Sequence, residues 1–381
     1  MRQRSSTSNS EPRPKYRFAA TPWGLMLHAV MFAVLPVAVL VFIYVLHDPF
    51  KVLRWHDDPF ADRLGFNKGT LSVSSFERFN PERHFDSFII GASVSCYYRA
   101  DEWRQYLPDS TCVTHFDSSW QPPTHLARFV EYLDRKDVPM HHVLLVLAPE
   151  VFTFVDDADN ISTLLPPAVV PCTLWPKIPS PLHALRFHYK FFTSFCSYRY
   201  LRPYEHWKRT GERDESDGTY IFDPQPVVYR HVVNEESIPE WDYMLDTDAA
   251  AFHTPKGLKK FHAPGDVYTP LPGGIKPEYR DALRRVAYVL RKRHADVKII
   301  LAPSPALYVL TPDDEAFMQQ TFGTLYSSAG CPYVNLTREF RPEQSDPSNF
   351  YDGIHYRPSL ASKYLRRAYS PPYGPFPADF E

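Results

Sequence analysis

Residues 85–91 read FDSFIIG and residues 143–148 read VLLVLA, and these two apolar runs decide the fold. Both end in small residues or before a proline, where a turn is expected. Three further short runs have the same character, at 111–116 (TCVTHF), 297–302 (VKIILA) and 333–336 (YVNL). Short apolar runs that are bounded by turns are typical of strands buried on both faces, as in a parallel sheet.

Helical segments lie between these runs. In residues 125–136 (HLARFVEYLDRK) and 277–294 (PEYRDALRRVAYVLRKRH), apolar side chains recur at the three- and four-residue spacing of one helix face. Further helices are expected at 313–322, directly after a proline, and at 359–369. The alternation of strand and helix predicts an α/β fold of three layers (α/β/α), in which a flavodoxin-like parallel sheet is the middle layer.

Residues 151–275 interrupt this alternation. They are rich in proline and aromatic residues, and the whole chain holds 38 prolines against 14 glycines. This composition predicts long, ordered and irregular loops rather than a flexible linker. We interpret the segment as a large irregular insertion between the third and fourth strands, or as a lid over the C-terminal edge of the sheet.

The N-terminal part of the chain has the composition of a membrane anchor. Residues 23–46 (WGLMLHAVMFAVLPVAVLVFIYVL) carry no formal charge over about the 20 residues that span a hydrocarbon core. We predict a transmembrane helix at 22–47, a basic tail at 1–21, a juxtamembrane connector at 48–80 and the main domain at 81–381. A cleaved signal peptide is the alternative, but the run is long for one and no small-residue cleavage site follows it.

The charges of the tail predict the orientation of this helix. One acidic residue, Glu11, opposes the basic residues of the tail, which are Arg2, Arg4, Arg13, Lys15 and Arg17. Positively charged flanks stay in the cytoplasm. We therefore expect a single-pass inner (plasma) membrane protein whose N-terminus is cytoplasmic and whose main domain faces the periplasm or the cell exterior.

Composition and motifs argue against several functional classes. The net charge of −2 gives no field of one sign, so nucleic acid is not expected as a partner. No H-E-x-x-H, Walker or G-x-G-x-x-G pattern occurs, so neither a metal nor a nucleotide cofactor is expected. The cysteines form no C-x-x-C pair. In an oxidising compartment Cys172 and Cys196 could form a disulfide; the alternative is that all five cysteines are small buried hydrophobic residues.

Ligands of an α/β sheet bind beyond the C-terminal ends of its strands, so candidate catalytic residues are sought in the turns there. After the first run, Gly91 and Ala92 precede Ser93, whose hydroxyl can be presented above the sheet or can instead cap a helix. Near the C-terminus, Asp352 stands three residues before His355. An aspartate so placed can hold the ring through Nδ1 and leave Nε2 to take a proton from a serine hydroxyl. The alternative is a loop aspartate and a structural histidine.

A serine after the first strand, followed by Asp-x-x-His before the last helix, is the chain order of the SGNH, or GDSL-like, hydrolase superfamily. The sequence FIIGASVSCYYRADEW resembles the first block of that superfamily, and YDGIHY resembles its last block. The resemblance covers roughly residues 85–150 and 280–370. It implies that Ser93 is the nucleophile, that His355 is the general base oriented by Asp352, and that no cofactor is needed.

Two blocks depart from the superfamily pattern. Residues 117–120 (DSSW) stand where an oxyanion glycine is expected, and residues 147–150 (LAPE) stand where an asparagine is expected. Loss of one oxyanion donor costs about 2.7–4 kcal/mol of transition-state stabilisation. The backbone N–H of Ser93 and a donor near Ser119 remain as candidates, and Glu150 is expected to hold substrate or brace the site.

The predicted anchor and the resemblance together imply a membrane-anchored serine esterase or O-acyltransferase acting on acyl esters of cell-envelope polysaccharide or lipid. The chain resembles the anchored members of the superfamily that acylate envelope polysaccharides more than its secreted esterases. One alternative is a non-catalytic scaffold of an envelope assembly complex. Another is a glycan-binding component that uses aromatic residues of the insertion, namely Trp207, Tyr220, Phe222 and Trp241.

Overall fold

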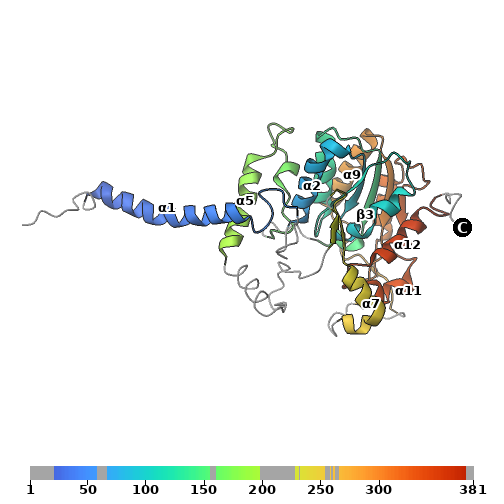
Figure 1. Cartoon of the computed structure of the whole chain (residues 1–381). Coiled ribbons are helices and arrows are strands. Elements are labelled where there is room, and N and C mark those ends of the chain that lie inside the picture. The colour runs from blue at the N-terminus through green and yellow to red at the C-terminus, as the bar shows by residue number, and fades with distance from the viewer. Residues whose placement is uncertain are drawn as a thin grey trace, which may run out of the picture. The chain divides into compact units, whose positions relative to one another are not determined.

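The computed structural model describes residues 21–57, 67–154, 160–197, 228–230, 232–253, 258, 261 and 266–374. The chain divides into two compact units, Met1–Pro49 and Phe50–Glu381 (Figure 1). The predicted basic tail lies outside the described residues except for Thr21. The aromatic residues Trp207, Tyr220 and Phe222 also lie outside them.

The described part of the first unit contains the helix α1 (Pro22–His47). The Thr21 hydroxyl caps it by accepting a hydrogen bond from the Gly24 N–H at 3.0 Å, and Asp48 ends it in the left-handed conformation. At about 1.5 Å per residue, its 26 residues extend about 39 Å, which exceeds the roughly 30 Å of a hydrocarbon core. By its length and composition, α1 is a candidate membrane span.

The second unit is built on a parallel sheet of five strands in the order β2-β1-β3-β7-β9. The strands are β1 (Ser87–Gly91), β2 (Val113–Asp117), β3 (His142–Leu147), β7 (Asp296–Leu301) and β9 (Tyr333–Asn335). Each coincides with a predicted apolar run. The order is that of flavodoxin-like sheets, so the predicted fold class is confirmed.

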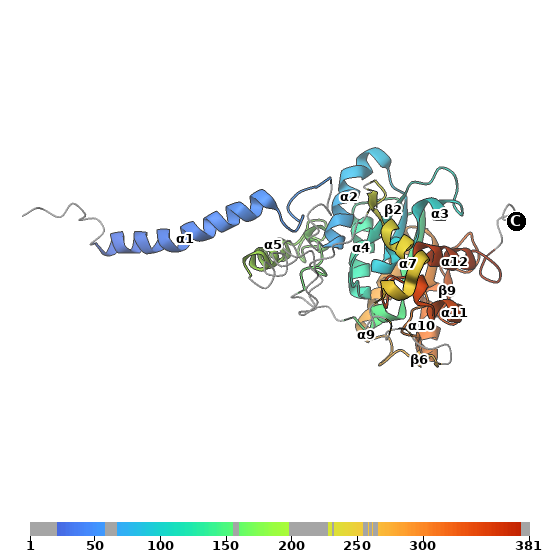
Figure 2. The same cartoon turned by 60° about the horizontal axis from the view of Figure 1, so that its bottom comes forward.

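Helices cover both faces of this sheet (Figures 1 and 2). One face is covered by α2 (Lys68–Arg83), α4 (Pro123–Arg135), α9 (Pro277–Lys292) and α10 (Pro312–Phe322). The other face is covered by α3 (Ala100–Arg104) and α12 (Pro358–Ala368). Successive strand residues alternate between the two cores, so that Ile90 lies in the first and Ile89 in the second, both fully buried. This alternation explains why the strands read as continuous apolar runs.

Helix α2 lies in the segment that the sequence analysis treated as a connector. Its inner face buries small polar side chains such as Ser72 and Ser75 beside Phe76, so the segment lacks the apolar periodicity that predicts a helix. Upstream, the ring of Trp55 packs edge-on against Phe79 of α2, with 5.5 Å between centroids. Residues of this segment therefore contribute directly to the packing of the second unit.

The chain between β3 and β7 is an insertion, as predicted, but it is not irregular throughout. It contains η2 (Pro149–Phe152), η3 (Pro167–Val169), α5 (Pro181–Cys196), β4 (Val228–Arg230), β5 (Glu235–Ser237), α7 (Pro239–Phe252) and β6 (Thr269–Pro270). Strands β4 and β5 form a hairpin, and the carbonyl of Val233 between them accepts a hydrogen bond from the His115 N–H of β2 at 3.0 Å. The hairpin therefore covers the edge of the sheet at β2. The remaining short elements are η1 (Ser93–Tyr97), β8 (Tyr308–Val309), α11 (Arg341–Gln344) and η4 (Pro347–Asn349).

All five cysteines have free thiols, so the suggested Cys172–Cys196 disulfide is wrong. A β-bridge between Pro171 and Pro179 holds Cys172 near the start of α5, whereas Cys196 ends that helix. A helix of 16 residues is about 24 Å long, far beyond the reach of a disulfide. The alternative of five buried cysteines is also wrong, because Cys196 and Cys331 are exposed. Only Cys96 is buried.

Candidate active site

The turn after β1 places Ser93 at the C-terminal edge of the sheet. Strand β1 ends at Gly91, Ala92 continues in extended conformation, and η1 begins at Ser93. A Cβ on Gly91 would lie 2.4 Å from the backbone oxygen of Val146 in β3 and 2.8 Å from the Cβ of Ser95. Only glycine permits this close approach of the two strands. The Ser93 side chain is therefore carried by a sterically constrained turn, and it remains partly exposed.

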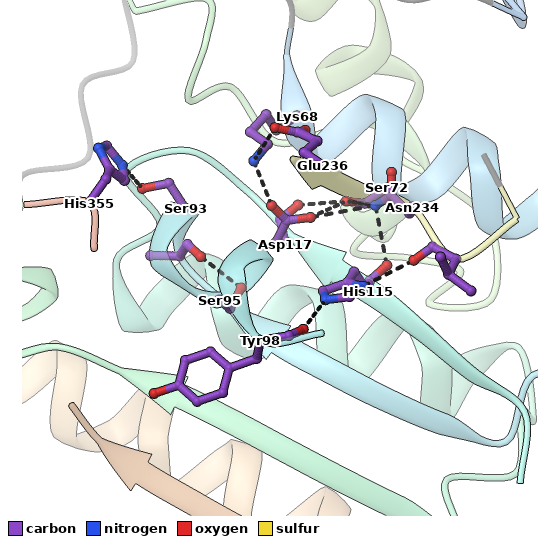
Figure 3. Close-up of polar contacts among 12 residues, drawn as sticks. Lys68, Ser72, Ser93, Ser95, Tyr98, His115, Asp117, Asn234, Glu236 and His355 are labelled. Carbon is purple, nitrogen blue, oxygen red and sulfur yellow. Dashed lines mark hydrogen bonds and ion pairs between the residues drawn. The ribbon is translucent and has the colours of Figure 1, made fainter. Parts of the chain in front are cut away.

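A hydrogen-bonded relay joins Ser93, His355 and Asp352. The Nε2 of His355 lies 2.8 Å from the Oγ of Ser93 (Figure 3), and its Nδ1 lies 2.8 Å from the Oδ2 of Asp352. An ionised carboxylate can only accept, so Nδ1 carries the ring proton and its N–H donates a hydrogen bond to Asp352. Nε2 consequently accepts the hydrogen bond of the Ser93 hydroxyl. The arrangement is suited to proton transfer from Ser93 to His355.

The carboxylate of Asp352 is held by the backbone of its own turn. Its Oδ1 accepts hydrogen bonds from the N–H groups of Ile354 and His355, both at 2.7 Å. Burial alone would raise the pKa of Asp352, but the charge and hydrogen bond of the His355 ring and these two backbone donors outweigh it. They hold the pKa well below its usual range, so the carboxylate stays ionised.

The turn that carries the relay rests on buried aromatic residues. A β-bridge joins Phe350 and Tyr356, both fully buried, and the Tyr351 N–H donates to the carbonyl of His355 at 2.8 Å. On the side of Ser93, the ring of Tyr97 lies 6.0 Å from that of His355 and 5.5 Å from that of Tyr351, centroid to centroid. The element η1 thus supplies both Ser93 and an aromatic wall for the histidine.

Helix α7 of the insertion is fastened to the same turn. The guanidinium of Arg357 bonds Asp242 at 2.9 Å and Asp246 at 2.7 Å, and the hydroxyl of Tyr351 donates to Asp242 at 2.7 Å. Trp241, a proposed glycan-binding aromatic, instead packs its ring 5.7 Å from that of Tyr351. The insertion therefore supports the turn of Asp352 and His355 from outside the sheet.

Ser119 lies at the same edge of the sheet as Ser93. Gly91 and Asp117 face each other in the register of β1 and β2, so each serine lies two residues beyond a paired strand end. The Ser118 N–H donates to the carbonyl of Gly91 at 3.3 Å. In the described part of the chain, no hydrogen bond involves the backbone N–H of Ser93 or of Ser119. Both N–H groups are therefore available as donors at this edge of the sheet.

A buried ionic network fills the position that follows β2. The Nζ of Lys68 lies 2.9 Å from Asp117 and 3.3 Å from Glu236 (Figure 3). Burial alone would lower the pKa of Lys68, but the charges around it raise the pKa well above its ordinary value, and burial raises the pKa of Glu236. The Ser72 hydroxyl donates to the backbone oxygen of Asp117 at 2.6 Å and receives a bond from Asn234 at 2.9 Å. Helix α2, strand β2 and the insertion therefore meet at the residue that replaces the expected glycine block.

Glu150 is not part of the relay. It is buried in η2 and its carboxylate accepts a hydrogen bond from the hydroxyl of Ser304, in the loop after β7. Burial raises the pKa of Glu150, and the bond from Ser304 offsets this only in part. Its described contacts brace two strand ends against each other rather than reach the relay.

The other nucleophilic side chains of η1 do not reach solvent. Ser95 is fully buried and its hydroxyl donates to the carbonyl of Ala92 at 2.8 Å. Cys96 is buried as well, and burial raises the pKa of its thiol far above its ordinary value. Ser93 is therefore the one accessible serine or cysteine of this element.

The two motif blocks predicted the relay of Ser93, His355 and Asp352 but not the residues that support it. Lys68 stood in a segment with no recognisable pattern, and Glu236 and Asp242 stood in the insertion. Arg357 directly follows the YDGIHY block, which was the one available signal, but nothing in the sequence indicated its partner 115 residues away.

No protein-family model matches the chain, and no curated protein matches its sequence. The chemistry of the chain is therefore indicated by the geometry of its site and by the resemblance of its two motif blocks. The relay is the part of that geometry with the most specific chemistry.

Proposed function

We propose that this chain is a membrane-anchored serine hydrolase or O-acyltransferase of SGNH type. The observation that carries the proposal is the 2.8 Å contact between Ser93 Oγ and His355 Nε2, in a relay completed by Asp352. These residues come from opposite ends of the domain and meet with complementary donor and acceptor roles. They also lie beyond the C-terminal ends of the strands, where α/β sheets bind their ligands. Both features favour a catalytic histidine over a structural one.

The chemistry that this geometry supports is acyl transfer through a covalent intermediate. Ser93 Oγ attacks the carbonyl carbon of an ester while Nε2 of His355 takes the hydroxyl proton. The resulting imidazolium is stabilised by the carboxylate of Asp352 and gives its proton to the departing alcohol as the ester C–O bond breaks. Water, or a sugar hydroxyl, then attacks the acyl-serine with His355 again as base, which releases the acid or the new ester and restores Ser93.

Two backbone donors support the developing oxyanion. The N–H groups of Ser93 and Ser119 are the candidates, because neither is used by a hydrogen bond in the described residues. Such a donor contributes about 2.7–4 kcal/mol to transition-state stabilisation. The missing glycine and asparagine blocks are therefore compatible with catalysis, since backbone N–H groups do not depend on side-chain identity.

The membrane anchor supports the class of substrate. With α1 as a membrane span and the basic tail in the cytoplasm, the Ser93 site faces the periplasm or the cell exterior. The esters within reach there are acylated glycans and lipids of the cell envelope. Hydrolysis and transfer to a sugar hydroxyl differ only in the acceptor that enters after the acyl-serine has formed.

Ester turnover by the full-length protein in detergent micelles tests this proposal. We expect p-nitrophenyl acetate to be hydrolysed by the wild type and not by Ser93→Ala. Ser110→Ala is the matched control, because Ser110 is an exposed serine in the turn before β2 and should leave turnover unchanged. Equal turnover by Ser93→Ala would overturn the mechanism. Absence of both hydrolysis and acyl transfer in the wild type would favour the non-catalytic scaffold.

A further inference from the structure

Helix α5 and the segment before it expose a row of large apolar side chains. More than half of each side chain is accessible, and the residues are Leu174, Trp175, Ile178, Leu182, Leu185 and Tyr189, which we call the 174–189 patch. Figures 1 and 2 both show α5 at the periphery, apart from the sheet and its covering helices. Large apolar side chains that are this exposed and lie together in one short segment indicate an interaction site rather than ordinary protein surface.

Helix α5 is apolar on two opposite sides. Phe187 and Phe191 are buried and attach the helix to the domain. Leu182, Leu185 and Tyr189 recur at three- and four-residue spacing on the other side. An apolar side of a helix is normally covered by other apolar groups. The outer side of α5 therefore needs an apolar environment that the described residues do not supply.

The charge of this region identifies the kind of environment. No aspartate or glutamate occurs between residues 160 and 197, whereas Lys177, Arg186 and Lys190 lie in or beside the patch. A basic helix with exposed leucine, tryptophan and tyrosine matches helices that lie in the interface of a bilayer with anionic lipids. Tryptophan and tyrosine are also the residues enriched at that level of the membrane.

Helix α5 packs against a residue that follows the candidate membrane span closely in the sequence. Phe50 follows the last residue of α1, His47, by three positions, so the two lie within about 11 Å of each other along any path of the chain. Phe50 is buried, and its ring packs edge-on against Phe191 of α5, with 5.4 Å between centroids. A bilayer that α1 crosses therefore has its surface within reach of α5.

We propose that the 174–189 patch docks into the interfacial region of the same bilayer that α1 spans. The second unit then has two attachments to the membrane: the covalent one through α1 and a lateral one through α5. The lateral contact restrains rotation of the domain about its anchor. This inference is independent of the chemistry of Ser93, but it does depend on α1 lying in a bilayer.

Site-directed fluorescence on the full-length chain tests the docking. The protein is reconstituted into vesicles of phosphatidylethanolamine and phosphatidylglycerol, in a background where the accessible cysteines are serine and only the buried Cys96 remains. An environment-sensitive dye is attached at Leu185→Cys, or at Ile178→Cys as a second patch position. Tyr243→Cys on α7 is the matched control, because Tyr243 and Leu185 are both 69% exposed on helices. Val39→Cys in α1 reports the span.

We expect the labels at Leu185→Cys and Ile178→Cys to emit at shorter wavelength and to be quenched severalfold by nitroxide lipids, like the label at Val39→Cys. The label at Tyr243→Cys should be quenched by iodide in water instead. Iodide quenching of the patch labels equal to that at Tyr243→Cys would overturn the docking. Protection from both quenchers would show a protein surface on the patch and would equally overturn it. If Val39→Cys escapes lipid quenching, α1 is not a span and the proposal fails with it.

Discussion

The substitution Asp352→Asn removes one function of the relay while keeping the shape of its side chain. Asp352 accepts three hydrogen bonds, from Nδ1 of His355 at 2.8 Å and from the N–H groups of Ile354 and His355 at 2.7 Å. An asparagine can keep its oxygen toward the two backbone donors, but its NH₂ group then faces Nδ1. Nδ1 must become the acceptor, and the ring proton moves to Nε2. A protonated Nε2 cannot take the proton of Ser93.

The size of the effect follows from this change of tautomer. In a chymotrypsin-type Ser-His-Asp triad, the corresponding change lowers kcat by about 10⁴-fold. At about 1.36 kcal/mol per factor of ten, that loss is about 5.4 kcal/mol of transition-state stabilisation. Substrate binding does not involve Nδ1, so KM should change far less than kcat.

Steady-state ester hydrolysis by the full-length protein measures the kcat and KM of Asp352→Asn. Asp346→Asn is the matched control, because Asp346 accepts a backbone bond from Ser348 at 2.9 Å in a similar turn but does not contact His355. We expect Asp346→Asn to keep kcat within about threefold, in line with the small effects of surface substitutions. If Asp352→Asn retained kcat to a similar degree, the tautomer argument, and with it the assigned role of Asp352, would be refuted.

Four further predictions concern the supports of the site. Gly91→Ala should destabilise the domain by about 1–3 kcal/mol, because its Cβ would meet the backbone of β3 at 2.4 Å, and an unchanged melting temperature would contradict this. Lys68→Met leaves the Asp117 carboxylate buried and unpaired, so denaturant unfolding should show a loss of about 3–5 kcal/mol that Asp117→Asn partly restores. Arg357→Met releases α7 and should lower kcat by about 10- to 100-fold through misplacement of the turn, with Arg357→Lys intermediate. Because the pKa of Asp352 is lowered on folding, its ionised form stabilises the domain above about pH 4, and the stability difference from Asp352→Asn should disappear as melting scans move to lower pH.

The sheet and its covering helices were predictable because burial on both faces leaves a simple signal. Runs such as 143–148 have no polar interruption, since successive residues enter opposite cores. Helix α2 was not predictable in the same way. Its inner face uses Ser72 and Ser75, which are small enough to pack closely but do not register as apolar. A search for periodic hydrophobic residues therefore does not detect such a helix.

The relay was predictable because its members are local motifs at the ends of recognisable elements. Ser93 lies two residues beyond β1, and Asp352 and His355 share one turn before α12. The ion pairs that support the relay were not predictable, because each joins two segments that only the fold brings together. Lys68 of α2 forms an ion pair with Asp117 of β2, and neither segment contains a sequence pattern that predicts this pairing.

Covalent labelling of Ser93 tests the central claim most directly. The full-length protein in detergent is treated with a fluorophosphonate probe, digested, and mapped by mass spectrometry. We predict a single phosphonylated site on the peptide that contains Ser93, lost in Ser93→Ala and strongly slowed in Asp352→Asn. A folded wild-type protein that does not react, or equal labelling of Ser93→Ala, would contradict the assignment of Ser93 as the nucleophile.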